Sequence, residues 1–476
     1  MRYQNYIQGQ WRDALSGHTW DVINPATEEL IARVPFGSAP DAQLAVEAAA
    51  NAQPLWAAMT AYERGAILRR AADLIRERLD LLAPIMTREC GKPLAEARGE
   101  WTACADLFDW FSEEGKRAYG RTIPARRAPK RLMSMPVPVG VVATITAWNF
   151  PAYLAVRKWS AALAAGCTVV ARPSELTPMC AMAAVNLLEE AGLPPGVLNL
   201  VNGEPEAIAN VFLTDPRVDK ISFTGSQRVG RILMRGAADG LKRLALELGG
   251  SAPVLIFDDA DVASAAKQAV QAKFRNNGQV CISPTRFYAQ QAVFEDFVDA
   301  VQQEIKGLVV GDGLQANVTT GPLITTAARG RVEGLVADAV ARGGMIVTGG
   351  TRPETLDHGY FYQPTLITNV APEMRVCHEE IFGPVMPVSP FNTVEEALKL
   401  ANATPYGLAA YAITRDLATA VQCYEGLKFG IVGVNDLVPA TAEGPFGGMK
   451  QSGWGREGAE EGLHEYMEAR FVSMAL

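Results

Sequence analysis

The sequence predicts an α/β protein with a doubly wound parallel sheet, followed by a second α/β domain. From Val137 onward, short apolar strands alternate with helices, which is typical of βαβ units. Within these strands apolar residues are continuous, which indicates a sheet covered on both faces. The 476 residues suffice for roughly two to four domains of about 150 residues each.

The first part of the chain is predicted to be helical after a short strand-like start. Apolar residues recur at helical spacing in 41–56, 64–82 and 94–119. The stretch 121–135 is rich in arginine and contains two prolines. We expect it to be an exposed excursion rather than a nucleic-acid patch, because charge runs usually solvate a surface.

The strands and helices that follow place three loops at one edge of the sheet. We expect strands at 139–146, 167–172, 197–201, 220–223 and 244–248, and helices at 152–165, 178–191, 206–213 and 227–238. Ligands of such sheets bind beyond the carboxyl ends of the strands. The segments 147–149, 172–175 and 224–226 should therefore face one crevice.

A second alternating block predicts the second α/β domain. Strands are expected at 252–256 and 287–289, and helices at 261–274, 293–306, 327–342 and 394–403. The sequence contains no tandem repeat.

Composition and charge exclude several classes of protein. Hydrophobic residues make up 49% and charged residues 20%, as in ordinary globular proteins. The net charge of −8 argues against a nucleic-acid binder. The most apolar stretch, 137–171, is interrupted by prolines and basic residues, and the first residues lack a signal pattern. We expect a cytoplasmic protein with a small-molecule substrate, no nucleic acid and no membrane.

The cysteines and histidines form no cluster with metal-ligand spacing. There are seven cysteines and four histidines, scattered along the chain. No Cys-x-x-Cys pair occurs, so neither a zinc site nor a disulfide framework is expected. Reduced thiols agree with a cytosolic location.

Three residues are candidates for chemistry, and each has an alternative interpretation. Cys281 follows a Gly-Gln turn just after a helix and is either a reactive thiol or a small buried hydrophobe. Glu247 ends an apolar strand and is either a general base with a raised pKa or a carboxylate pointing to water. Asn149, at a strand-to-helix turn, is either a donor into a site or a helix cap.

A glycine-bearing turn, Phe223-Thr-Gly-Ser226 with Gly230, connects a strand to a helix. Such a turn lets backbone N–H groups approach a phosphate at a helix N-terminus. It is not the G-x-G-x-x-G fingerprint of dinucleotide sites, so by itself it is a weak signal.

Seven stretches in order along the chain carry a resemblance to a known family. They are Trp148-Asn-Phe-Pro151, Arg172-Pro-Ser-Glu175, Phe223-Thr-Gly-Ser226 with Gly230, Leu246-Glu-Leu-Gly-Gly250, Gly278-Gln-Val-Cys281, Glu379-Glu-Ile-Phe-Gly-Pro384 and Pro445-Phe-Gly-Gly448. With these stretches the sequence resembles the aldehyde dehydrogenase superfamily over nearly its whole length, and most closely its succinate-semialdehyde and 2-oxoglutarate-semialdehyde dehydrogenases.

The resemblance implies a catalytic role for four residues. Cys281 would be the nucleophile, and Glu247 the general base. Asn149 and the backbone N–H of Cys281 would form the oxyanion hole, and Lys158 matches a family lysine near the active site. A thiohemiacetal and then a thioester would form on Cys281, and water would release the acid.

The resemblance also implies a nicotinamide cofactor. Glu175 would bind the adenosine ribose and repel a 2′-phosphate, which favours NAD. Arg172 stands where the family usually has lysine and could pair with that phosphate, so NADP stays possible. The implied cofactor residues are Thr146, Trp148, Arg172, Ser174, Glu175, Gly225, Ser226, Val229, Gly230, Leu248, Glu380 and Phe382.

Two arginines narrow the substrate class. Arg157 lies eight residues beyond Asn149 and Arg275 six before Cys281, where semialdehyde dehydrogenases bind the substrate's far carboxylate. Thr441 and Phe446 would complete the substrate site. Three alternatives remain: small neutral or hydroxy aldehydes, a non-catalytic member of the fold, and acyl transfer to coenzyme A, which the retained Glu247 disfavours.

The resemblance gives the domain boundaries. The cofactor domain would span 1–118 and 138–246, and the catalytic domain 247–436. An oligomerisation element would comprise 119–137 and 462–476, with 437–461 returning to the cofactor domain. A homodimer or homotetramer is expected.

Overall fold

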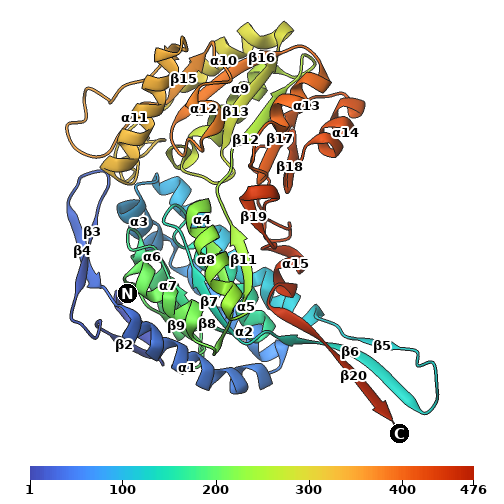
Figure 1. Cartoon of the computed structure of the whole chain (residues 1–476). Coiled ribbons are helices and arrows are strands. Elements are labelled where there is room, and N and C mark those ends of the chain that lie inside the picture. The colour runs from blue at the N-terminus through green and yellow to red at the C-terminus, as the bar shows by residue number, and fades with distance from the viewer. Residues whose placement is uncertain (476) are drawn as a thin grey trace.

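The computed structural model describes residues 1–475 and contains two large sheets, one above the other in Figure 1, and a long projecting arm. The larger sheet has the order β19-β11-β10-β7-β8-β9-β1-β2. Its five central strands, β11, β10, β7, β8 and β9, are parallel to one another, as predicted. The strands are β1 (Asn5–Ile7), β2 (Gln10–Arg12), β7 (Val141–Ile145), β8 (Thr168–Arg172), β9 (Leu198–Leu200), β10 (Val218–Thr224), β11 (Arg243–Glu247) and β19 (Gly453–Trp454).

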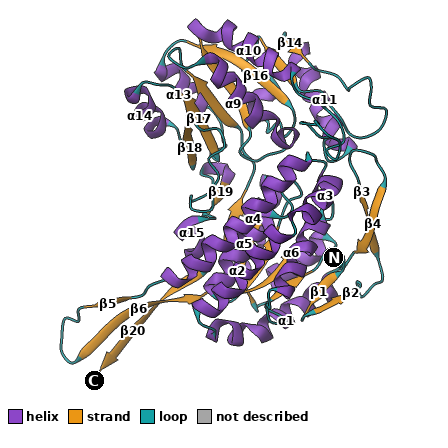
Figure 2. Ribbon diagram, turned by 180° about the vertical axis from the view of Figure 1, so that it is seen from behind, coloured by secondary structure: helices purple, strands orange, loops and turns teal. Residues whose placement is uncertain are grey.

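Helices cover both faces of this sheet, which explains its continuous apolar strands (Figures 1 and 2). The helices on one face are α2 (Ala61–Glu77), α3 (Leu79–Cys90), α4 (Leu94–Glu114), α5 (Tyr153–Ala165) and α6 (Pro178–Glu190). The helices on the other face are α1 (Ala39–Ala58), α7 (Pro205–Thr214) and α8 (Gln227–Asp239).

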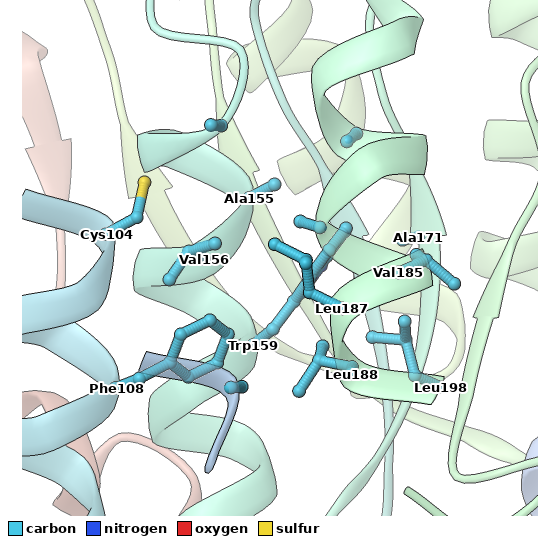
Figure 3. Packing of buried hydrophobic residues seen from close by; sticks show 14 of the residues in the cluster. Cys104, Phe108, Ala155, Val156, Trp159, Ala171, Val185, Leu187, Leu188 and Leu198 are labelled. Carbon is cyan, nitrogen blue, oxygen red and sulfur yellow. The ribbon is translucent and has the colours of Figure 1, made fainter. Parts of the chain in front are cut away.

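The core beside α5 is built from small and large apolar side chains that interlock. Figure 3 shows Trp159 and Val156 of α5 between Phe108 of α4 and Leu187 of α6. From Leu154 to the end of the helix every residue of α5 is buried, including two basic side chains. Because buried charges are costly, their positions in α5 point to a site.

The second sheet follows the order β14-β15-β16-β13-β12-β17-β18 and is parallel except for the edge strand β14. Its strands are β12 (Ala252–Ile256), β13 (Pro284–Gln290), β14 (Met345–Thr348), β15 (Thr365–Thr368), β16 (Val385–Phe391), β17 (Ala409–Ile413) and β18 (Ile431–Val434). Its helices are α9 (Val262–Phe274), α10 (Phe294–Lys306), α11 (Thr326–Ala341), α12 (Arg375–His378), α13 (Val394–Asn402) and α14 (Leu417–Gly426).

The projecting arm is a three-stranded antiparallel sheet formed by β5 (Arg121–Ile123), β6 (Lys130–Pro138) and β20 (Met467–Ala475). It extends away from both large sheets in Figures 1 and 2. The boundary expected at residue 462 falls inside helix α15 (Ala459–His464), and the arm's last strand begins only at Met467. A separate hairpin, β3 (Thr19–Ile23) with β4 (Leu30–Pro35), lies near the N-terminus.

The extent of one helix predicted from the sequence was wrong. The stretch 64–82 was expected to be continuous, but it divides into α2 and α3 at Arg78, whose φ of −117° lies outside the helical range. None of the helices in residues 1–475 is long and apolar enough to cross a membrane. In the same residues no three His, Cys, Asp or Glu side chains are arranged to hold a metal ion.

Candidate active site

A cavity of about 270 Å³ opens where the carboxyl ends of β7, β10 and β11 face the second sheet. Two of the three loops expected at this edge, 147–149 and 224–226, line it. The third loop, 172–175, follows the neighbouring strand β8 and lies outside the lining. Cys281, Glu247 and Asn149, which are far apart in the sequence, all line this cavity.

The loop before Cys281 has an unusual backbone. Asn276, Asn277 and Gly278 have φ values of 46°, 55° and 74°, in the left-handed region that is unfavourable for residues other than glycine. A Cβ at Gly278 would lie 2.2 Å from the carbonyl oxygen of Gly383, so only glycine fits. Such strain persists where surrounding contacts fix it, and it concentrates at functional sites.

Contacts of the Gln279 side chain hold the same loop. Its Oε1 accepts the N–H of Ile324 at 2.9 Å, and its Nε2 donates to the carbonyl of Asn276 at 3.0 Å. Cys281 itself is half-buried, whereas five of the other six cysteines are fully buried. Burial, together with the carboxylates of Glu247 and Glu380, raises the pKa of the Cys281 thiol to about 12. A base must therefore remove its proton before it can react as a thiolate.

Asn149 is a donor beside Cys281 and not a helix cap. Its Nδ2 donates to the carbonyl of Gln279 at 3.0 Å, two residues before Cys281. The residue that precedes α5 is Ala152, which provides no side-chain cap. The geometry therefore agrees with the first of the two interpretations of Asn149.

Glu247 belongs to a buried group of three charged side chains. It is 4% exposed, and neither carboxylate oxygen has a hydrogen-bond partner among the described residues. Burial and the neighbouring Glu457 raise the pKa of Glu247 well above its usual value. Lys158 of α5 is fully buried and forms an ion pair with Glu457. The arrangement is a buried carboxyl with a raised pKa next to a second acid held by a lysine, which is the environment that suits a general base.

Glu457 was missed by the sequence interpretation. It is separated from Lys158 by 299 residues, and its neighbours form no motif that indicates a partner. Its backbone pairs with Phe446 through two hydrogen bonds of 2.7 Å, which connects it to the loop opposite Cys281. The sequence feature that could have pointed to such a partner is Lys158, because a buried lysine requires a carboxylate nearby.

A second, smaller cavity of about 80 Å³ lies on the other side of Cys281 and contains both candidate arginines. The Arg157 guanidinium stacks between the rings of Tyr153 and Phe446, at 4.6 and 4.1 Å from their centroids. Arg275 lies 5.1 Å from the ring of Phe150. In the described part of the chain neither arginine forms an ion pair; Arg157 Nη2 donates to the Tyr153 hydroxyl at 2.9 Å, and Arg157 Nε has no hydrogen-bond partner.

The other two expected substrate residues differ in their placement. Phe446 lines both cavities. Thr441 is exposed and lines neither cavity, and its role in the substrate site stays a prediction. Its neighbour Ala440 lines the smaller cavity instead. The loop turns after Ala440, and the carbonyl of Ala442 accepts the N–H of Ala459, which fixes this turn outside the cavity.

Comparison with known proteins decides the family. A profile of the aldehyde dehydrogenase family matches residues 11–472. The chain belongs to this family. It is 45% identical to the succinate-semialdehyde dehydrogenase [NADP(+)] GabD of Escherichia coli K12, covering all of this chain and 98% of that protein. It is 44% identical to a glutarate-semialdehyde dehydrogenase of Pseudomonas aeruginosa, with 99% and 98% covered.

The solved structures agree with the fold. The crystal structure of a succinate-semialdehyde dehydrogenase from Burkholderia pseudomallei superposes with a TM-score of 0.98 at 46% identity, covering all of this chain and 98% of that one. The predicted fold class and the predicted enzyme class, an NAD(P)-dependent aldehyde dehydrogenase, are confirmed.

The nicotinamide end of a dehydrogenase cofactor fits the larger cavity. Trp148 and Phe382 meet edge to face at 5.6 Å between centroids, and both line it. Glu380 accepts the N–H of Gly250 at 3.0 Å, and burial raises its pKa to about 7. A Cβ at Gly249 would lie 2.4 Å from Glu380 Oε2, so this glycine leaves room for that carboxylate.

The phosphate end fits the N-terminus of α8. The Ser226 side chain caps the helix by accepting the N–H of Val229 at 3.4 Å. Gly230 packs on Leu248, and a Cβ there would lie 2.7 Å from it. Gly225, Ser226 and Leu248 line the larger cavity, but Val229 and Gly230 do not. The buried hydroxyl of Thr224, which also lines it, has no partner among the described residues, as expected of a group that awaits a ligand.

Three of the expected cofactor residues, Arg172, Ser174 and Glu175, lie at the end of β8, and a fourth, Thr146, directly follows β7. Arg172 is buried, forms an ion pair with Glu175, and donates to the carbonyl of Gly203 at 3.1 Å. Thr146 donates its N–H to the carbonyl of Arg172 at 3.2 Å. The Ser174 hydroxyl accepts the N–H of Leu176 at 3.3 Å. The four expected residues, Thr146, Arg172, Ser174 and Glu175, lie outside the larger cavity.

Proposed function

We propose that this aldehyde dehydrogenase oxidises an aldehyde with a carboxylate at its far end. The substrate is a dicarboxylic acid semialdehyde such as succinate semialdehyde or 2-oxoglutarate semialdehyde. The observation that carries the proposal is a pair of arginines, Arg157 and Arg275, that lie in one small cavity with Cys281 and have no carboxylate partner within residues 1–475.

The energetics favour an anionic ligand in this cavity. A buried charge that is not neutralised by an opposite charge is costly, and the Arg157 side chain is almost completely buried. A carboxylate placed between two guanidinium groups offsets that cost through charge-assisted hydrogen bonds. The names of the similar enzymes from Escherichia coli, Pseudomonas aeruginosa and Burkholderia pseudomallei, all semialdehyde dehydrogenases, support the same substrate class.

The first covalent step joins Cys281 to the aldehyde carbon. Glu247 takes the thiol proton, because it is the unpartnered carboxylate in the same cavity. The sulfur then forms a bond to the carbonyl carbon, and the electron pair of the C=O bond moves to oxygen. Asn149 Nδ2 and the backbone N–H of Cys281 stabilise this oxyanion; such donors typically contribute about 10²- to 10³-fold in rate.

The second half-reaction releases the acid. When bound, NAD(P) accepts the hydride that leaves the substrate carbon, and a thioester remains on Cys281. Glu247, after it has released the thiol proton to solvent, takes a proton from water as the water oxygen attacks the thioester carbon, and the sulfur leaves as a thiolate. Glu457 beside Glu247 raises the pKa of the base and Lys158, which is paired with Glu457, lowers it, so the pair sets how readily Glu247 gains and loses a proton.

For the cofactor we propose a preference for NAD with NADP accepted. Glu175 is the acceptor suited to the ribose hydroxyls of NAD. Its ion pair with Arg172 occupies the guanidinium that would bind a 2′-phosphate. Binding of NADP therefore requires Arg172 to break its ion pair with Glu175 and to bind the 2′-phosphate instead.

We further propose a cytoplasmic homodimer or homotetramer assembled through the projecting arm. The arm exposes Met135, Phe471 and Met474, whose side chains are 45%, 63% and 44% exposed. An exposed apolar arm of this kind is suited to a second copy of the chain.

The substitution Arg157→Met tests the proposed function, with Arg275→Met as the companion variant. We expect KM for succinate semialdehyde to rise about 10- to 100-fold in each, because a charge-assisted hydrogen bond contributes about 1.5–3 kcal/mol. Steady-state rates of cofactor reduction measure this. Butanal, which has the same number of carbons without the charge, is the internal control. Equal losses for both aldehydes would contradict carboxylate recognition.

A further inference from the structure

We propose that the buried ion pair Lys92–Glu100 positions two walls of the active site, the oxyanion donor Asn149 and the start of helix α5. The inference rests on the proposed function of Asn149. Lys92 and Glu100 are positioning residues, because they act through the groups that they hold, although Glu100 also lines the smaller cavity.

Lys92 lies in the loop between α3 and α4, and its side chain is only 1% exposed. Its ammonium pairs with Glu100 and donates to the backbone carbonyl of Asn149 at 2.9 Å. It also lies 3.9 Å from the ring centroid of Phe150. The cation is thus surrounded by Glu100 and by the segment that carries Asn149.

Glu100 supplies the cap that the sequence of α5 lacks. Its Oε1 accepts the N–H groups of Ala152 and Tyr153, both at 3.0 Å. The first N–H groups of a helix have no partner within the helix, and a carboxylate there also interacts favourably with the helix dipole. Helix α5 carries Arg157 and Lys158 in its first turns. Glu100 therefore fixes the N-terminal end of the helix, where both basic residues lie.

The same end of α4 also contacts the Cys281 loop. Glu96 Oε2 accepts the N–H of Asn276 at 2.8 Å. The Asn276 side chain donates to the carbonyl of Asn149 at 2.9 Å, so this carbonyl oxygen receives two donors. Helix α4 therefore helps to hold both the segment that carries Asn149 and the loop that carries Cys281.

The backbone that carries Lys92 has little freedom to relax. Gly91 has a φ of 84°, and a Cβ there would lie 2.7 Å from the Pro322 ring. Leu94 donates its N–H to the carbonyl of Gly313 at 3.0 Å. A change at Lys92 will therefore be transmitted to Asn149 rather than absorbed by the loop.

Positioning, rather than stability alone, explains why a charged pair occupies this place. Removing a buried lysine and a glutamate from water is costly, and an apolar pair of equal volume would fill the space without that cost. An apolar pair would offer no donor to the Asn149 carbonyl and no acceptor for the N–H groups of α5. Placement errors of about 1 Å at a reacting group cost on the order of 100-fold in rate.

The experiment uses the full chain with the double substitution Lys92→Met and Glu100→Gln. The Glu100→Gln change keeps an acceptor for the α5 N–H groups, and the double substitution leaves neither charge of the pair buried alone. We expect kcat for succinate semialdehyde to fall about 10- to 100-fold. The dissociation constant for NAD, measured by fluorescence titration, should stay within about twofold. The matched control is the double substitution Lys220→Met and Glu465→Gln. Lys220 and Glu465 form a second ion pair with an equally buried lysine, and neither residue lines the two active-site cavities. This control should leave kcat within about twofold of the wild type.

A double-mutant cycle with Asn149→Ala separates positioning from a general structural effect. If Lys92 and Glu100 act through Asn149, then Asn149→Ala lowers kcat much less in the double-variant background than in the wild type. Additive losses, or an unchanged kcat in the double variant, would overturn the inference. An unchanged kcat in Asn149→Ala alone would instead contradict the proposed function of Asn149.

Discussion

Replacing Cys281 with alanine is expected to lower kcat for aldehyde oxidation by about 10⁴- to 10⁶-fold, the range seen when a covalent nucleophile is removed. Within residues 1–475, Cys281 is the single cysteine that lines the two active-site cavities. The change removes one half-buried sulfur, so the fold should be retained. Cofactor reduction followed by absorbance reports the rate, and NAD binding by fluorescence titration reports an intact site.

The matched control is Cys377→Ala. Cys377 is also half-buried, but it lies in α12, outside both cavities. This variant should keep kcat within about twofold. If Cys281→Ala retained more than a tenth of the wild-type rate while Cys377→Ala lost activity, the nucleophile would be assigned to the wrong cysteine.

The second large effect is expected for Glu247→Gln, with kcat lower by about 10²- to 10⁴-fold, as for loss of a general base. The amide fills the same buried space but accepts no proton from the thiol or from water. The control is Glu89→Gln, a buried carboxylate that accepts the N–H groups of Met179 and Cys180 and lines neither cavity. That control should keep kcat within about twofold, and equal losses in both variants would contradict the assignment of the base.

Glu247→Gln should also change how stability depends on pH. The pKa of Glu247 in the folded protein is raised above the ordinary 4.5, so the folded state binds more protons than the unfolded state above that pH. Wild-type stability therefore falls as pH rises from about 4.5 toward the folded-state pKa, and the variant is spared this loss. Melting temperatures at about pH 5 and pH 8 should show the variant gaining on the wild type at the higher pH. A constant difference would contradict a buried carboxyl with a raised pKa.

The strands and helices that bear the site could be predicted because their patterns are local. Strand β12 and helix α9 lie almost where the apolar pattern placed them. The crevice followed from topology, because parallel strands bring loops 147–149 and 224–226 to one edge. The edge strand β14 and the small helix α12 gave no such pattern, since they are short and partly exposed.

The electrostatic environment of the site could not be predicted in the same way. The raised pKa of Glu247 depends on its burial and on Glu457, which comes from a distant part of the chain. The ion pair of Lys92 with Glu100 likewise depends on how α4 packs against α5. The exposure of Thr441 likewise depends on a distant contact, because the turn of its loop is held by the hydrogen bond between Ala442 and Ala459.

The most direct test of the central claim compares kcat/KM of the wild-type enzyme for succinate semialdehyde and butanal, and for glutarate semialdehyde and pentanal, with NAD and then NADP. Each pair has the same number of carbons and differs in the far carboxylate. We expect the charged member to be favoured by about 10²- to 10⁴-fold in each pair, from the two guanidinium contacts at about 1.5–3 kcal/mol each. Equal values, or faster oxidation of butanal and pentanal, would contradict the claim that Arg157 and Arg275 recognise the substrate's carboxylate.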